Sequence, residues 1–579
     1  MSEEAEAAEA GYAGDGAGVV ARFASPAPRA YGGGLARSLS LERMGGGILA
    51  ALLAISIASF LFVIFLDVSQ LGKWAAQIDE YYFSACAVHG IHAASIPIAG
   101  CHDNKAPLIF LIYELIFKAA GDFNAPALRV VAISVALANA GILASIAYRV
   151  SGTVAAALTV SLLLATMASD IQLMALKTEL VGGLFVSCAI FVLSAPVRSK
   201  STLRLALAGL FIGAAVVTKQ TYAFAGFAII AWLLLDLRFA SRTQTFAVLA
   251  RCAIFALCVL APFLLFWLSF SRQGAASDFL ASFFLYPLVY GPSCVSGAAV
   301  FLRCAGGVLS GLSDYIVLVA MTIGAATALV ISGPAADRKR YSDPRWLIFL
   351  VALFLLIQLA LTPWWFAAYV MMVLGPMALL SGVVAGDYWK SAWRSGAKAT
   401  FTVLMVLFAG VTLGAAKTWH SNARIENALA LVRPGAATVP AAASPRYAYQ
   451  LGAHPDFYAK NGLVPASSIQ FLWALPGTPE HWSYRMPKAN SAKRRWLDAE
   501  QARNLSRLYA DFSKTPPRYI MFSDQTMRVL GASGAIGIPG FQAYLDGNCK
   551  LVPKASAREQ HSLYECAKPD MPGALTRGR

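Results

Sequence analysis

The sequence predicts a polytopic α-helical membrane protein with a small C-terminal α/β domain. Of its 579 residues, 58% are hydrophobic and 13% are charged, whereas a soluble globular protein is roughly 45–50% apolar. Apolar stretches recur from residue 46 to residue 416, and only the chain after residue 416 has the composition of a soluble domain. These observations exclude a single water-soluble globule.

About eleven of the apolar stretches are long enough to cross a bilayer, which takes about 17–25 residues in a helix. Lysine and arginine gather in every second gap, so the net charge of +16 does not indicate nucleic acid binding. The positive-inside rule places those gaps in the cytoplasm and the others outside. The predicted spans cover residues 46–66, 127–148, 152–169, 178–195, 203–218, 221–236, 251–270, 313–332, 346–361, 364–384 and 399–416.

Three regions follow from this pattern. Residues 1–45, rich in alanine and glycine, are expected to be a disordered cytoplasmic tail. Residues 46–416 are expected to form the transmembrane domain, with an external loop at 68–126. Residues 417–579 are expected to form a periplasmic α/β domain, because they contain strand-like and helix-like segments in the order strand, helix, strand. These segments are 446–451, 498–512 and 518–522.

Cysteine usage supports this orientation. Six of the nine cysteines fall outside the predicted spans as three pairs of sequence neighbours, which fits an oxidising compartment such as a periplasm; chance spacing is the alternative. The expected location is the bacterial inner (plasma) membrane, with the N-terminus cytoplasmic and the C-terminus periplasmic. The pairs are Cys86 with Cys101, Cys294 with Cys304, and Cys549 with Cys566.

The external loop at 68–126 contains charged residues that are unusual so close to a predicted span. Two adjacent acids, Asp79 and Glu80, follow the first span by about a dozen residues. The loop ends in an apolar segment, 108–118, that is too short to cross a bilayer. Its Glu114 and Lys118 are four residues apart, so we predict a helix lying in the membrane interface.

Four stretches resemble motifs of the GT-C type membrane glycosyltransferases. The resemblance is to the group that uses dolichyl- or undecaprenyl-phosphate sugars, including bacterial mannosyl-, aminoarabinose- and galacturonosyltransferases. Asp79 to Tyr82 resembles the acidic pair of the first external loop, and His102 to Leu108 resembles an Asp, Lys, Pro-Pro motif, with Ala106 in place of the first proline. Lys177 to Glu179 resembles an Arg-Pro-acid element. The likeness covers residues 46–240, including Gly213 to Gln220, which resembles the stretch before span six.

The resemblance implies a GT-C-like fold and a hexosyl- or pentosyltransferase. It would move a sugar, with inversion, from a polyprenyl-phosphate donor to a lipid, glycan or protein acceptor. Such a reaction needs a base for the acceptor proton and cations for the leaving phosphate. Asp79 is the candidate base, and Glu80 is a support or a metal ligand. Candidate phosphate-binding residues are Lys105, Lys219, Arg272 and Arg303, and candidate substrate-orienting residues are His102, Asp103, Lys177 and Glu179.

Several of these residues also have a structural explanation. Asp79 could cap a helix, Lys105 and Lys219 could extend along the membrane to reach water, and Glu179 could pair with Lys177. No cofactor is implied directly. A divalent cation is a candidate, with His89, His92 and His102 as weak candidate ligands, although their spacing matches no standard site.

The alternative function is a transporter or flippase of a lipid-linked saccharide. Such a protein would be expected to show paired repeats and charges at mid-membrane depth. In this sequence we find no internal repeat, and the candidate charges lie at the outer ends of the predicted spans. A receptor that binds through its C-terminal domain would leave the acidic pair unexplained.

Overall fold

The computed structural model describes most of the helical region and much of the C-terminal segment. Residues 1–45 and the predicted spans 46–66 and 399–416 lie outside the described residues, except for residue 54, as do His102 and Asp103. The described residues are 54, 78–92, 105–169, 175–194, 202–235, 237, 241–289, 298–331, 343–362, 367–395, 446–451, 456–470, 474–476, 491–523, 538–553 and 561–567.

Within these ranges, a helix lies over each of the other nine predicted spans. By length and composition, α4, α9 and residues 370–389 of α16 can cross a membrane, and the bent pair of α12 (Ala298–Leu312) and α13 would make a fourth span. The remaining helices are apolar but shorter, so the count of eleven is not established. The nine helices are α4 (Ala125–Ser151), α5 (Thr153–Ser169), α6 (Thr178–Leu193), α7 (Thr202–Val216), α8 (Ala223–Leu234), α9 (Arg242–Arg272), α13 (Ile316–Ile331), α15 (Pro344–Ala360) and α16 (Val370–Ser395).

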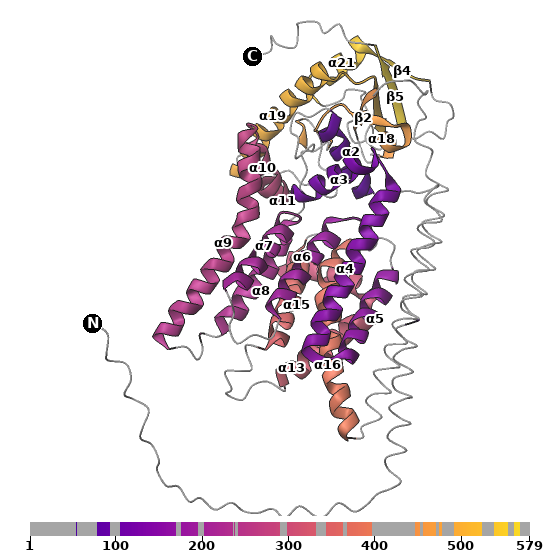
Figure 1. Cartoon of the computed structure of the whole chain (residues 1–579). Coiled ribbons are helices and arrows are strands. Elements are labelled where there is room, and N and C mark those ends of the chain that lie inside the picture. The colour runs from indigo at the N-terminus through magenta and orange to yellow at the C-terminus, as the bar shows by residue number, and fades with distance from the viewer. Residues whose placement is uncertain are drawn as a thin grey trace, which may run out of the picture. The chain divides into compact units, whose positions relative to one another are not determined.

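Glycines spaced four residues apart let the helices pack closely. On α7, a Cβ atom at Gly213 would lie 2.5 Å from the carbonyl oxygen of Val259, and one at Gly209 would lie 2.6 Å from that of Phe255. Gly382 and Gly386 of α16 lie equally close to α5. Small residues at this spacing are typical of helix contacts in membranes. They explain why α7 lies against α9, and α5 against α16 (Figure 1).

Further helices lie in the segments predicted to be external. The predicted interfacial helix is present as α3 (Leu108–Ala120), and α2 (Ile78–His92) precedes it. The segment after α9 contains α10 (Ala276–Leu280), a π-helical turn η4 (Ala281–Leu285) and α11 (Tyr286–Val289). An apolar helix that we did not predict, α12 (Ala298–Leu312), follows. Arg303 and two glycines interrupt its run of apolar residues, so the sequence does not predict a span there.

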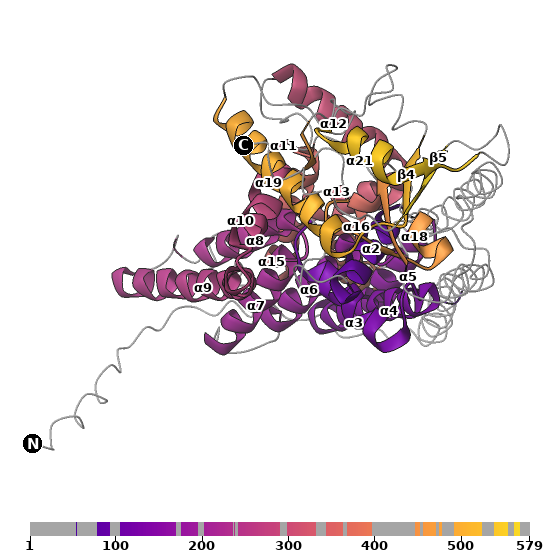
Figure 2. The ribbon, with the colours of Figure 1, turned by 90° about the horizontal axis from the view of Figure 1, so that it is seen from above.

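The C-terminal segment forms a five-stranded mixed sheet. Its strand order is β2-β1-β3-β5-β4, with β1 parallel to β2 and β3, and β5 antiparallel to β3 and β4. The predicted strands coincide with β1 and β3, and the predicted helix lies within α19. The strands are β1 (Arg446–Leu451), β2 (Leu463–Pro465), β3 (Tyr519–Ser523), β4 (Cys549–Leu551) and β5 (His561–Cys566), and the helices are α18 (Asp456–Asn461), α19 (Ala492–Lys514) and α21 (Phe541–Asn548). Figure 2 shows α21 beside β4 and β5.

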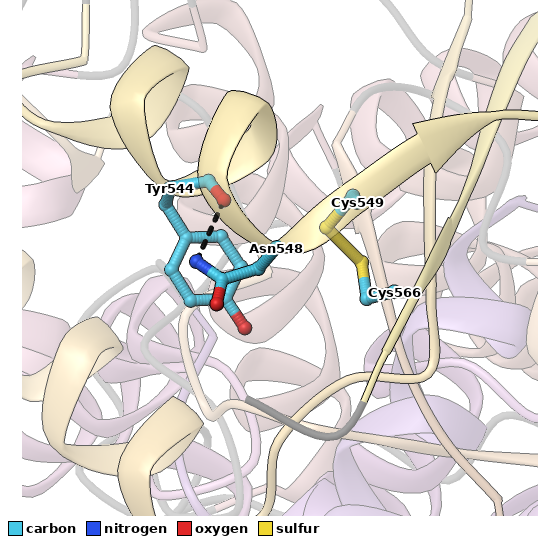
Figure 3. Close-up of a disulfide and its surroundings, with 4 residues drawn as sticks. All are labelled: Tyr544, Asn548, Cys549 and Cys566. Carbon is cyan, nitrogen blue, oxygen red and sulfur yellow. Dashed lines mark hydrogen bonds between the residues drawn. A yellow bond between two sulfur atoms is a disulfide. The ribbon is translucent and has the colours of Figure 1, made fainter. Parts of the chain in front are cut away.

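A disulfide between Cys549 and Cys566 joins β4 to β5 (Figure 3). The preceding helix α21 ends beside it, where the Asn548 side chain donates to the Tyr544 carbonyl oxygen at 2.9 Å. Cys86 and Cys304 are also disulfide-bonded, whereas Cys188, Cys252 and Cys258, all on apolar helices, are free. The predicted pair of Cys549 with Cys566 is confirmed, whereas the predicted partners of Cys86 and Cys304 lie outside the described residues.

Candidate active site

Asp79 lies in the first turn of α2, with its side chain 46% exposed and one carboxylate oxygen 3.5 Å from the Lys177 ammonium. Burial by the surrounding protein acts to raise the pKa of this carboxyl. The positive charges of Lys177, Lys105 and Lys219 outweigh that effect and hold the pKa of Asp79 below its usual value. Asp79 is therefore an ionised carboxylate that solvent can reach, in contact with Lys177 and within the electrostatic field of Lys105 and Lys219.

The neighbouring acid, Glu80, faces the interior of the protein and is fully buried. One of its oxygens accepts a hydrogen bond from the Arg129 guanidinium of α4 at 2.6 Å, and the other accepts one from the Leu176 backbone N–H at 2.9 Å. The Tyr113 hydroxyl of α3 donates to the Leu176 carbonyl oxygen at 2.8 Å. Both polar backbone groups of Leu176 are thus fixed, and the next residue, Lys177, is held beside Asp79.

Glu179 binds Lys219 instead of the expected partner, Lys177. The Lys219 ammonium donates to one oxygen of Glu179 and lies 3.9 Å from the centre of the Tyr369 ring, while the Thr178 hydroxyl donates to the other oxygen at 2.9 Å. The pair with Lys219 takes the place of the structural alternative, a pair with Lys177, although the positive charge of Lys177 still acts on Glu179. Because α6 begins at Thr178, Lys177 has an extended backbone outside the helix and turns toward Asp79.

The lysine-bearing segments lie side by side. The Leu108 backbone N–H donates to the Val217 carbonyl oxygen at 3.0 Å, which joins the segment after Lys105 to the end of α7 before Lys219. The predicted topology places all these segments at outer ends of spans, so the site gathers segments expected on one side of the membrane. Several cations close to one carboxylate can bind a phosphate while the carboxylate stays ionised.

Other candidate residues are placed elsewhere or lack a described side chain. Arg272 is exposed at the end of α9, and the side chain of Arg303, on α12, is outside the described part of the chain. The buried His89 is 2.8 Å from the Pro465 carbonyl oxygen, and the exposed His92 is 2.5 Å from Asp122. Within the described ranges there is no group of three acids, histidines or cysteines that could hold a metal ion.

The sequence analysis missed Arg129, Tyr113 and Tyr369. Arg129 carried a usable signal, because an arginine inside an otherwise apolar span needs a buried partner. The acids of the Asp79 loop were among those predicted on the same side. The two tyrosines carried no comparable signal, since tyrosines at span ends are common as interfacial anchors.

Glu114 is a second buried acid, on helix α3, which also carries Tyr113. Its side chain is 2% exposed and lies 3.5 Å from the partly exposed Lys118 ammonium, and one oxygen has no hydrogen-bond partner among the described residues. Burial, opposed by Lys118, raises the pKa of Glu114 to about 7. Between pH 4.5 and 7 the folded protein therefore keeps a proton that the unfolded chain has lost, so this group's contribution to stability falls as the pH rises through 7.

Glu114→Gln is expected to be more stable than the wild type at pH 8, by up to ~3 kcal/mol, because glutamine cannot ionise. The advantage should shrink as the pH falls to 5. Thermal unfolding of both proteins across this range measures the effect, with Glu565→Gln, at a half-exposed carboxylate, as the control. A difference that does not change with pH would contradict the prediction.

Comparisons with known proteins show which family model and which solved structures the chain resembles. Residues 104–267 match the family model described as dolichyl-phosphate-mannose-protein mannosyltransferase. The structure resembles that of ArnT from Cupriavidus metallidurans bound to undecaprenyl phosphate, with a TM-score of 0.53 at 14% identity over 88% of this chain and 97% of that chain.

The apo state of the same protein gives a TM-score of 0.51 at the same identity and coverage. No curated protein sequence matches the chain. At 14% identity the structural likeness shows the fold. Together with the family match, it confirms the resemblance to the GT-C type membrane glycosyltransferases of the polyprenyl-phosphate-sugar group.

Proposed function

We propose that the protein is an inverting glycosyltransferase that moves a sugar from a polyprenyl-phosphate donor to a hydroxyl group of a lipid, glycan or protein. The observation that carries this proposal is the Asp79 carboxylate, which solvent can reach and which lies within the field of Lys177, Lys105 and Lys219. A base and a set of phosphate-binding cations are the two things that this reaction requires. The match to a mannosyltransferase family model over residues 104–267 supports the proposal.

In this mechanism the acceptor hydroxyl attacks the anomeric carbon of the sugar from the face opposite the phosphate. Asp79 takes the hydroxyl proton as the new carbon–oxygen bond forms. The bond between the anomeric carbon and the phosphate oxygen breaks, and its electron pair leaves with the polyprenyl phosphate. Lys105 and Lys177 stabilise the charge that develops on this leaving group, and Lys219, fixed by Glu179, adds to the positive field.

The predicted topology places this chemistry on the outer face of the inner membrane. The donor would then arrive within the outer leaflet and the acceptor from the periplasm, where residues 417–579 would also lie. The external disulfides support this orientation, since such bonds persist in oxidising compartments. The identity of the sugar, hexose or pentose, is for the assay to decide.

The test uses purified full-length protein in lipid nanodiscs with undecaprenyl-phosphate mannose or undecaprenyl-phosphate aminoarabinose, each labelled in the sugar. A cell-envelope extract supplies acceptors. We expect one donor to lose its label to the acceptor fraction with stoichiometric release of undecaprenyl phosphate. Intact donors in both reactions would refute the proposal. Transfer of an intact donor between leaflets would instead support the flippase alternative.

A further inference from the structure

The helix that carries Asp79 also packs against the C-terminal sheet. Residues 49–579 form one compact unit, within which α2 contacts β2 and α18, and Figure 1 shows these elements beside one another. Ala85 of α2 is fully buried in a cluster with Phe457, Tyr458 and Leu463. One helix therefore spans the distance from the candidate active site to the sheet.

His89 forms the polar contact between α2 and the sheet. Its Nδ1 lies 2.8 Å from the carbonyl oxygen of Pro465, at the end of β2, and the residue is 1% exposed. A carbonyl oxygen only accepts, so Nδ1 must carry the proton and donate. Nε2 has no hydrogen-bond partner among the described residues. Burial lowers the pKa of His89, while the bond to Pro465 and the charge of Asp511 act in the opposite direction.

The other side of the β2 end is held by α19. The Asp511 carboxylate of this helix accepts hydrogen bonds from the Ser467 hydroxyl at 2.8 Å and from the Ser468 backbone N–H at 3.2 Å. The segment that follows β2 is therefore fixed between α2 and α19.

Closer to the N-terminus of α19, two of its side chains contact the segment after α9. Arg507 donates to the Asp278 carboxylate at 2.8 Å, and Glu500 accepts from the Tyr286 hydroxyl at 3.1 Å. This segment also packs Phe279 and Phe283 against Ala106 and Val217. Ala106 directly follows Lys105, and Val217 lies two residues before Lys219. The sheet and its helices are thus connected to both the carboxylate and the lysines of the site.

We propose that the C-terminal sheet positions the active site, and that His89 is the positioning residue that fixes α2, and with it Asp79, to the sheet. The inference rests on the proposed glycosyl transfer. Ten residues separate His89 from Asp79, about 15 Å along a helix. With Glu80 bound to Arg129 at one end of α2 and His89 bound to Pro465 at the other, the helix can neither rotate nor shift. Asp79 is thereby held facing Lys177.

Substituting His89 by asparagine or by glutamine distinguishes this positioning role from a general role in packing. The amide nitrogen of asparagine can occupy the place of Nδ1, whereas that of glutamine reaches the place of Nε2. We expect His89→Asn to keep kcat within about threefold of the wild type. His89→Gln and His89→Ala should lower kcat by about 10-fold to 100-fold with little change in the KM for the donor, because Asp79 acts on bound substrate.

Hydrogen exchange of the α2 amides provides a readout that does not depend on activity. It should be faster in His89→Gln and unchanged in His89→Asn. If wild-type protein transfers sugar but the three variants share one kcat, or His89→Gln exchanges at the wild-type rate, the positioning role is refuted. If the wild type shows no transfer, the proposed function fails, and the exchange rates still decide whether His89 holds α2.

Discussion

Asp79→Asn is expected to lower kcat for sugar transfer by about 10²- to 10⁴-fold, the usual contribution of a positioned general base. Asparagine has nearly the same shape but cannot accept the proton from the acceptor hydroxyl. The donor KM should change little, because the lysines remain in place. The melting temperature should also stay close to that of the wild type, since the pair with Lys177 is half exposed and such pairs contribute ~1 kcal/mol or less.

Asp122→Asn is the matched control for this experiment. Asp122 is an acid of the same segment, 68–126, but it pairs with His92, and its side chain is 36% exposed. This variant should transfer sugar at the wild-type rate. If Asp79→Asn also retains the wild-type rate, Asp79 is not the base, whereas an equal loss in both variants would point to a general effect of charge in this region.

The local features of this structure could be predicted from the sequence. Apolar runs predict the helices, because the spacing of apolar residues within a segment depends on that segment alone. The adjacent acids predict the site, because charged side chains at a membrane are costly and usually functional. The helix α12 was not predicted, because Arg303 and two glycines interrupt its apolar run. The number of spans could not be fixed either, since several of the observed helices are shorter than a bilayer requires.

The partners within the site depend on contacts between distant segments. Glu179 binds Lys219, 40 residues away, and not Lys177, two residues away. The predicted span 178–195 already leaves Lys177 outside α6, but nothing in the sequence indicates that Lys177 faces Asp79. The contact of His89 with Pro465 joins residues separated by 376 positions. Without the arrangement of α2 on the sheet, His89 resembles any other loop histidine, which explains why it was considered only as a metal ligand.

The buried pair of Glu80 and Arg129 is expected to have the largest effect on stability. Side-chain exposure is 0% for Glu80 and 4% for Arg129, so Arg129→Met would leave a carboxylate buried without its counter-charge. Breaking such a pair costs about 3–5 kcal/mol. We therefore expect a large decrease in the melting temperature of Arg129→Met, measured by thermal unfolding in detergent.

The double variant Glu80→Gln with Arg129→Met tests this explanation directly. It removes both charges, while the glutamine oxygen can still accept from the Leu176 backbone N–H that Glu80 now binds. Replacing a whole buried pair by neutral groups is often neutral for stability, whereas losing one partner is not. The double variant should therefore regain most of the stability lost in Arg129→Met. A double variant as unstable as the single one would show that Arg129 stabilises the protein mainly by packing and not by neutralising Glu80.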